Sequence, residues 1–122
     1  MSFLASSRLL IDLSNALYHR FEEIGGIEYL EESITCFREG LNLCPIGNPN
    51  RSYCLNNFAT AILTRFHWQQ LGRMEDLEEA ITSHRQALAL RPHGHPDRSF
   101  SLTNYASAMC TRFQQLGRMD DL

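Results

Sequence analysis

The side chains best suited to catalysis or metal binding in this sequence are its five histidines and four cysteines. His93 and His95 flank a glycine just before a proline, but the similar segment IGN at 46–48, also followed by a proline, has no imidazole. No set of histidine, cysteine and acidic residues has the spacing of a zinc site. No glycine-rich phosphate loop or nucleophile motif is present, and the acids of MEDLEE at 74–79 are interpreted as a solvated helix start. We therefore expect no enzymatic activity, no metal and no cofactor.

The four cysteines form no C-x-x-C pair: Cys36, Cys44, Cys54 and Cys110. We interpret them as small apolar residues of a reduced, intracellular chain, with disulfides or a metal site as the alternative. The net charge of −3 lacks the basic footprint of a nucleic-acid-binding protein. No window approaches the roughly 18 apolar residues of a membrane span, and the start lacks the features of a secretion signal. These features predict a cytoplasmic protein without nucleic-acid or membrane partners.

The chain repeats itself. Residues 24–66 match 71–113 at a shift of 47, and LGRMEDL at 71–77 matches LGRMDDL at 116–122 at a shift of 45. A weaker match carries 8–25 onto 100–117. The difference between the shifts is His67-Trp68, and for Trp68 both an interaction hot spot and a helix cover are open interpretations. Self-similarity at such a period indicates stacked supersecondary units.

Each unit is predicted to hold two helices, which we name A and B. The A helices carry apolar residues at helical spacing, in one copy Leu55, Phe58, Ala59, Ile62 and Phe66. We predict A helices at 6–24, 51–71 and 98–116, B helices at 27–43 and 74–90, and the stub of a third B helix. Short loops make neighbouring helices antiparallel, and no pair buries its own stripe. The sequence predicts one all-α array over 1–122, an α-α superhelix or solenoid and a segment of a longer array.

The helix ends have their own signals. Glycines follow the A helices, where a left-handed residue commonly ends a helix: Gly25, Gly72 and Gly117. Prolines are expected to end the B helices: Pro45 and Pro92. Asn50 and Asp97 are placed to cap the following A helices.

The segment MEDLEEAITSHRQALALRP resembles the second helix of a tetratricopeptide repeat (TPR), with Ala80, His84, Ala87 and Pro92 at the positions of that motif. GHPDRSFSLTNYA and NPNRSYCLNNFA are similar to the turn and first helix of the longer kinesin-light-chain-type repeats. The unit departs from the family because its A helix runs on and its length exceeds the usual 34 or so residues. The resemblance implies a superhelix whose concave wall is lined by the A helices.

The resemblance further implies a protein-protein interaction module that binds an extended peptide in that groove. Asn57 and Asn104 match the position of a peptide clamp in such repeats. Asparagine suits this role because its amide can both donate hydrogen bonds to a peptide backbone and accept them from it. The candidate peptide-binding residues are Asn15, Tyr53, Asn56, Asn57, Thr60, Phe100, Thr103, Asn104 and Ser107. By position in the motif, Arg8, Asp12, His19, Thr64 and Thr111 also point inward. The alternative is that these asparagines bond to adjacent units. Arg20, Arg65 and Arg112 recur before the phenylalanine of each A helix and are expected to pair with acids of a neighbouring helix.

A second hypothesis is a structural or self-associating segment of a larger scaffold or regulatory protein, with no ligand of its own. The last A helix is predicted to lack a full cover over Tyr105, Met109, Phe113 and Leu116. A homodimer through this uncapped C-terminal end would supply that cover.

Overall fold

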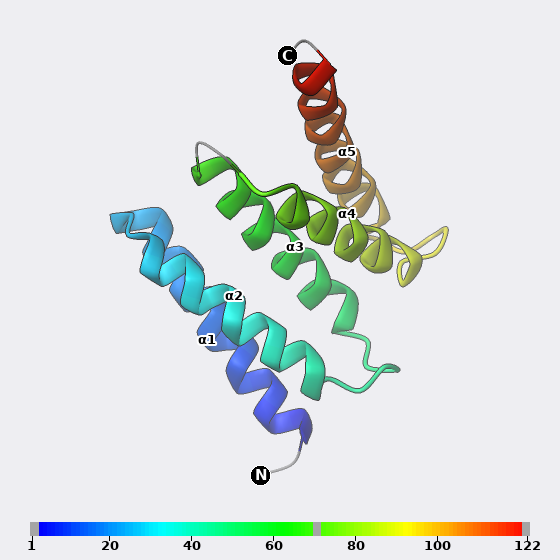
Figure 1. Cartoon of the computed structure of the whole chain (residues 1–122). Coiled ribbons are helices and arrows are strands. Elements are labelled where there is room, and N and C mark those ends of the chain that lie inside the picture. The colour runs from blue at the N-terminus through cyan, green and yellow to red at the C-terminus, as the bar shows by residue number, and fades with distance from the viewer. Residues whose placement is uncertain (1–2, 70–71, 121–122) are drawn as a thin grey trace.

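The computed structural model describes residues 3–69 and 72–120, which form five α-helices and no strand (Figure 1). The helices are α1 Phe3–Ile24, α2 Ile27–Leu43, α3 Arg51–Trp68, α4 Met74–Ala89 and α5 Arg98–Asp120. Each packs against the next one along the chain, and α3 also touches α5. In Figure 1, α1 and α2 run side by side in opposite directions, as do α3 and α4. The predicted all-helical fold with neighbour-to-neighbour packing is confirmed.

Two helix ends differ from the predicted ones. The helix predicted over 51–71 ends at Trp68, and residues 70–71 of that prediction lie outside the described residues. The helix predicted to end at 116 continues through Gly117 to Asp120. Gly117 has no positive φ, so it does not end α5, and the predicted stub of a further B helix is wrong over residues 118–120. Residues 121–122 lie outside the described part of the chain.

The glycines after the first two A helices act differently from each other. Gly25 has a φ of 82° and its amide donates to the carbonyl of Phe21 at 2.8 Å, as predicted for a left-handed helix end. Gly72 has no positive φ. The backbone at Gly72 instead passes so close to α3 that a Cβ on this residue would lie 2.5 Å from the carbonyl oxygen of Phe66. Gly72 is thus required by close approach and not by its backbone angle.

The turns that lead into α3 and α5 are held by equivalent residues, but not by the predicted cap. Asn50 makes no side-chain capping bond to α3. Its own amide donates to Asn48 Oδ1 at 2.8 Å, and in the later copy the amide of Asp97 donates to His95 Nδ1 at 3.1 Å. The side chain two residues earlier shapes each turn, and an amide and an imidazole do this equally well.

The core lies between α1, α2 and α3 and continues to α4 and α5. Its larger members are Leu30, Ile34, Phe37, Phe58, Ile62, Leu77 and Ile81. Each such side chain contributes about 1.5–3 kcal/mol through its burial. α1 and α2 approach closely because small residues face one another: Gly40 would place a Cβ 3.0 Å from Ile11, and Ser7 Oγ donates to the Gly40 carbonyl at 2.8 Å.

Arg65 joins three helices. From α3, its Nε and Nη2 donate to both carboxylate oxygens of Asp76 in α4 at 3.0 and 2.7 Å, and its Nη1 donates to Glu31 of α2 at 3.0 Å. Its equivalent Arg112 lies 2.9 Å from Glu78 of α4. The predicted pairing with acids of a neighbouring helix is confirmed for these two arginines. The Asp76 bond was not predicted, and it is the most buried of the three, with side-chain exposures of 19% and 10%.

Candidate functional site

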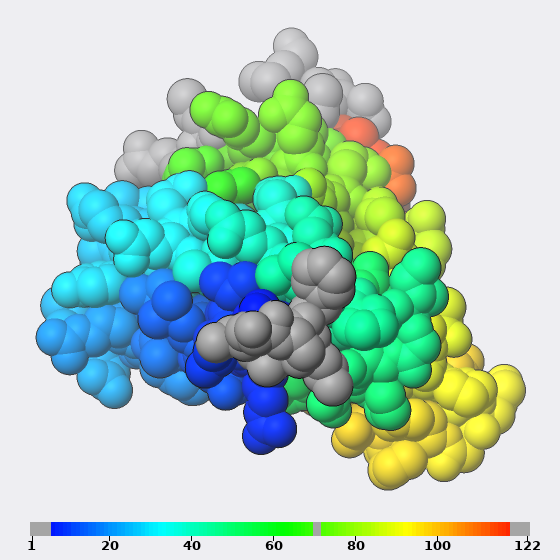
Figure 2. Space-filling model, turned by 90° about the horizontal axis from the view of Figure 1, so that it is seen from below, coloured from blue at the N-terminus to red at the C-terminus, as the bar shows by residue number. Residues whose placement is uncertain are grey.

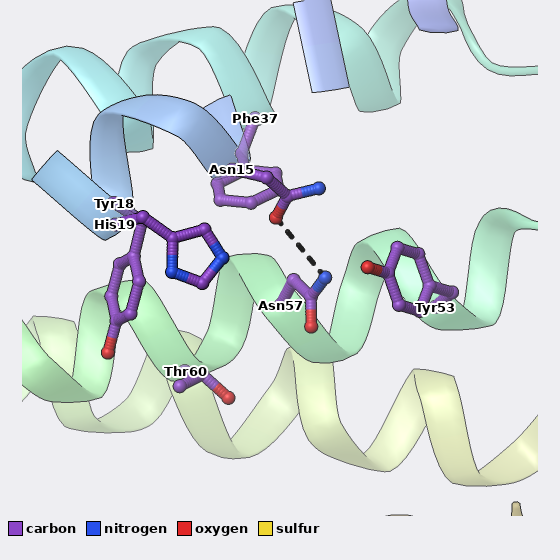
Figure 3. Close-up of a pocket in the computed structure, with 7 residues that line it drawn as sticks. All are labelled: Asn15, Tyr18, His19, Phe37, Tyr53, Asn57 and Thr60. Atoms are coloured by element: carbon purple, nitrogen blue, oxygen red, sulfur yellow. Dashed lines mark hydrogen bonds between the residues drawn. The ribbon is translucent and has the colours of Figure 1, made fainter. Parts of the chain in front are cut away.

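A polar pocket of about 290 Å³ lies between α1 and α3 (Figure 3). Asn15, Tyr18 and His19 come from α1, Phe37 from α2, and Tyr53, Asn57 and Thr60 from α3. Four of these residues were predicted as binding candidates: Asn15, Tyr53, Asn57 and Thr60. They come from segments about 40 residues apart in the chain, and the fold brings them to one cavity.

The side chains in this pocket retain hydrogen-bonding capacity. Asn57 Nδ2 donates to Asn15 Oδ1 at 3.4 Å, which is a long and weak bond (Figure 3). Each amide has further donor or acceptor positions, because an asparagine can make about four hydrogen bonds. Thr60 Oγ1 donates to the Asn56 carbonyl at 2.9 Å, so its oxygen is still able to accept. Tyr53 is 51% exposed and presents its ring at the edge of the pocket.

A second pocket of about 470 Å³ adjoins the first, since Tyr53 lines both. It lies between the first turns of α1 and the loop that connects α2 to α3. Its lining includes Ile11, Cys44, Pro49 and Cys54, with Arg8 and Asp12 also present. Viewed from below, that loop and the turn between α4 and α5 lie on the same face as the start of α1 (Figure 2). Of the inward-pointing candidates, His19 lines the first pocket and Arg8 and Asp12 line the second.

The other predicted binding residues lie elsewhere. Asn56 is only 2% exposed, and its Oδ1 accepts a hydrogen bond from Asn104 Nδ2 at 3.0 Å. The prediction that Asn56 faces a groove is therefore wrong: the residue is a buried acceptor between α3 and α5. Phe100, Thr103 and Ser107 are exposed on α5 but line neither of these two pockets.

The two asparagines predicted as clamps each donate to an asparagine of the preceding A helix. For Asn104 the bond is short and its acceptor is buried, which fits the alternative interpretation of a contact between adjacent units. For Asn57 the bond is long and the side chain lines an open pocket. Asn57 is thus the better candidate of the two for contact with a ligand.

Tyr18 and Phe37 were missed as pocket residues. Tyr18 bonds to Thr64 across the two helices at 2.9 Å. It stands where the other copies have Leu63 and Cys110, and this departure from the repeat was the available signal. Phe37 is 1% exposed and belongs to the apolar stripe of α2, so nothing in its sequence context separates it from the core.

The predicted self-association residues fall into two pairs. Tyr105 and Met109 are half-buried against the cluster of Phe66, Leu77, Ile81 and Ala108, so α4 already covers part of them. Phe113 is 79% exposed and Leu116 is 44% exposed. The exposed end of α5 is thus narrower than the four residues predicted.

The cysteines are free thiols. Cys44 and Cys54 are buried as small apolar residues, and burial raises the pKa of Cys54 to about 12, whereas Cys110 is exposed. Among the described residues there is no group of three or more histidine, cysteine and acidic side chains that could hold a metal ion. No helix in the described ranges is long and apolar enough to cross a membrane.

No family model, curated protein or solved structure matches the chain. Its helices, pockets and internal repeat therefore carry the functional interpretation.

Proposed function

We propose that the chain is a TPR-like helical solenoid, similar to the kinesin-light-chain-type repeats, that binds an extended peptide segment of a protein partner. The groove would run along the A helices α1, α3 and α5. The observation that supports this proposal is the pocket between α1 and α3, where Asn15, Asn57 and Thr60 meet beside an exposed tyrosine. A cytoplasmic location, and the absence of catalysis and of nucleic-acid or membrane partners, remain predictions from the sequence.

The chemistry of the pocket suits a peptide backbone better than a charged ligand. Its lining contains no carboxylate and no guanidinium, and the Nδ1 of His19 lies 3.1 Å from Glu22. The amides of Asn15 and Asn57 can bond to both the N–H and the C=O groups of an extended chain. Tyr53 adds apolar contact area at low cost in conformational entropy. The adjoining pocket, with Ile11 and Pro49, can take a side chain of the same peptide.

The proposal is tested with a random peptide library displayed on phage and selected against the wild-type chain. A selected peptide is then synthesised, and its dissociation constant is measured for Tyr53→Ala and Asn57→Ala. We expect each variant to weaken binding about tenfold or more, which corresponds to roughly 1.4 kcal/mol. Leu90→Ala serves as the control, because Leu90 is exposed to a similar extent, 43% against 51% for Tyr53, and lines neither of the two pockets.

Melting curves separate ligand contact from stability. Tyr53 is half exposed and Asn57 makes only one long bond, so both variants are expected to melt within a few degrees of the wild type. No enriched peptide, or peptides that bind all variants equally, would refute the groove. Asn104→Ala is unsuitable for this test, because it removes the hydrogen-bond donor of the buried Asn56.

The second candidate function is a structural or self-associating segment of a larger scaffold or regulatory protein. The exposed Phe113 and Leu116 at the end of α5 favour it. Sedimentation velocity at high concentration tests whether two chains meet through this end. A dimer that Phe113→Asp dissociates is expected in that case, and a single monomeric species at every concentration contradicts it.

A further inference from the structure

The outer face of α5 is apolar and exposed, whereas the same face of α3 is buried. Leu102, Ala106 and Phe113 of α5 are exposed, to 44% for Leu102 and 79% for Phe113. At the shift of 47 residues, their counterparts in α3 are Leu55, Ala59 and Phe66, which are 5%, 0% and 4% exposed. The two helices therefore carry the same face in two different environments. We call Leu102, Ala106 and Phe113 the α5 face.

The helix that follows α3 covers part of the α3 face. Phe66 clusters with Leu77 and Ile81 of α4, and Leu55 shares a core cluster with Ala80 and Ala87 of α4 as well as with residues of α1 and α2. The covering helix presents a buried stripe with helical spacing, in which His84 is the one residue that is not apolar: Leu77, Ala80, Ile81, His84 and Ala87. The first turn of α4 also carries a negative charge, because the carboxylate of Asp76 accepts hydrogen bonds from Nε and Nη2 of Arg65.

We propose that the α5 face docks an amphipathic helix of a protein partner with the chemistry of α4: small and branched apolar residues at this spacing, and an acid in the first turn. The side chains that would receive it repeat those of α3. Arg112 repeats Arg65: its Nε lies 2.9 Å from Glu78 of α4, as Arg65 pairs with Glu31 of α2, and its side chain is 37% exposed. The other guanidinium nitrogens of Arg112 would then take an acid of the incoming helix, as Arg65 takes Asp76. This proposal does not rest on the peptide groove, because neither Tyr53 nor Asn57 belongs to the α5 face.

A helical partner fits this face better than a second copy of the chain. In the middle of the molecule, the A helix α3 is flanked by the B helices α2 and α4. The outermost helices, α1 and α5, are both A helices (Figure 1). α1 also leaves Leu9 and Leu13 exposed, at 56% and 50%. Two copies joined at their ends would place an A helix against an A helix, which lacks the small-residue stripe and the acidic first turn of α4.

The first experiment uses the chain's own covering helix as the probe. A fluorescent peptide of residues 73–91 is titrated with the wild-type chain, and binding is followed by anisotropy. We expect saturable binding that weakens at least about tenfold with Ala106→Arg, because the new side chain stands in the middle of the α5 face, at the position whose α3 counterpart, Ala59, is fully buried. The matched control is Gln114→Arg, an equally charged change on α5 outside the α5 face. A peptide with Ile81→Asp is expected not to bind.

A tethered probe removes the concern that a short peptide is not helical by itself. A flexible glycine-serine linker and then residues 73–91 are appended after Leu122. Because α5 is helical through Asp120, the linker provides the return onto the α5 face, and the covering sequence is present at high effective concentration. We expect the melting temperature of this extended chain to exceed that of the wild type, and Ala106→Arg to abolish the increase.

Two results would overturn the proposal. One is that neither probe has an effect, or that both effects are insensitive to Ala106→Arg. The other is a dimer of the wild-type chain that Ala106→Arg dissociates while the peptide does not bind, since a second copy would then occupy the face. Loss of library-peptide binding by Tyr53→Ala leaves both outcomes unchanged, so the groove and the α5 face are judged separately.

Discussion

His84 makes the stability of this protein sensitive to mild acid. The imidazole is 1% exposed in α4, and its Nδ1 has no hydrogen-bond partner among the described residues. Burial disfavours the imidazolium form and lowers the pKa of His84 from 6.5 to about 4. The unfolded chain therefore binds a proton between these two values that the folded chain does not bind.

The sign and size of the effect follow from this difference. Because the folded-state pKa is the lower one, the favourable contribution is fully present above pH 6.5 and is lost progressively as the pH falls toward 4. Between pH 7 and pH 5 the free energy of unfolding should fall by about 2 kcal/mol through His84 alone. That is a large fraction of the total stability of a small domain, typically about 5–15 kcal/mol.

The assay is urea unfolding at pH 7, 6 and 5 for the wild type, His84→Phe and His67→Phe. His84→Phe keeps an aromatic ring and should be less sensitive to acid by about 2 kcal/mol over this range. His67→Phe is the matched control, because it replaces an exposed histidine and leaves the buried one in place. All other titrating groups are shared, and the comparison isolates the buried ring. Equal pH dependence in the wild type and His84→Phe would refute the reasoning.

Three further predictions concern stability and are checked by chemical denaturation at pH 7. Arg65→Gln should lower the free energy of unfolding by about 2–3 kcal/mol, because it leaves the nearly buried carboxylate of Asp76 without its partner. Arg38→Gln, which breaks an exposed pair, should lower it by less than about 1 kcal/mol, and equal losses for the two variants would contradict this. Gly117→Ala should stabilise the protein by about 0.5–1 kcal/mol, since the added Cβ meets no other atom, and a loss of stability would argue against a continuous helix at this position. Gly72→Ala should destabilise the protein by about 1–3 kcal/mol, because its Cβ would clash with the carbonyl of Phe66. Asn104→Ala should cost about 1–3 kcal/mol by leaving a buried amide oxygen without a donor, and an unchanged midpoint would exclude that bond.

The sequence predicted the helices because their apolar residues recur at helical spacing in three related copies. It failed at Gly117, where the match to Gly72 suggested an end. The two glycines share a position in the repeat. A Cβ on Gly72 would meet the carbonyl of Phe66, whereas a Cβ on Gly117 would meet no other atom. The local sequence contains no sign of that contact, because it depends on how α4 returns along α3.

The candidate site was predictable in part for a similar reason. Asn57 and Thr60 were predicted to line a concave wall of A helices, and they line the pocket between α1 and α3. Asn56 follows the same polar pattern, yet it is buried because α5 brings Asn104 to it. Spacing along one helix shows which side chains share a face, but the neighbour that covers the face decides which of them meet solvent.

The three hydrogen bonds of Arg65 affect the cooperativity of unfolding. Glu31 and Asp76 belong to helices two places apart in the chain, and one guanidinium holds both. If every helix were tied only to its immediate neighbours, the two ends could open one after the other. Because Arg65 is shared, unfolding of α4 removes Asp76, which orients the guanidinium that also binds Glu31 of α2. Hydrogen exchange in α2 and α4 should consequently slow or quicken together, as a single cooperative block.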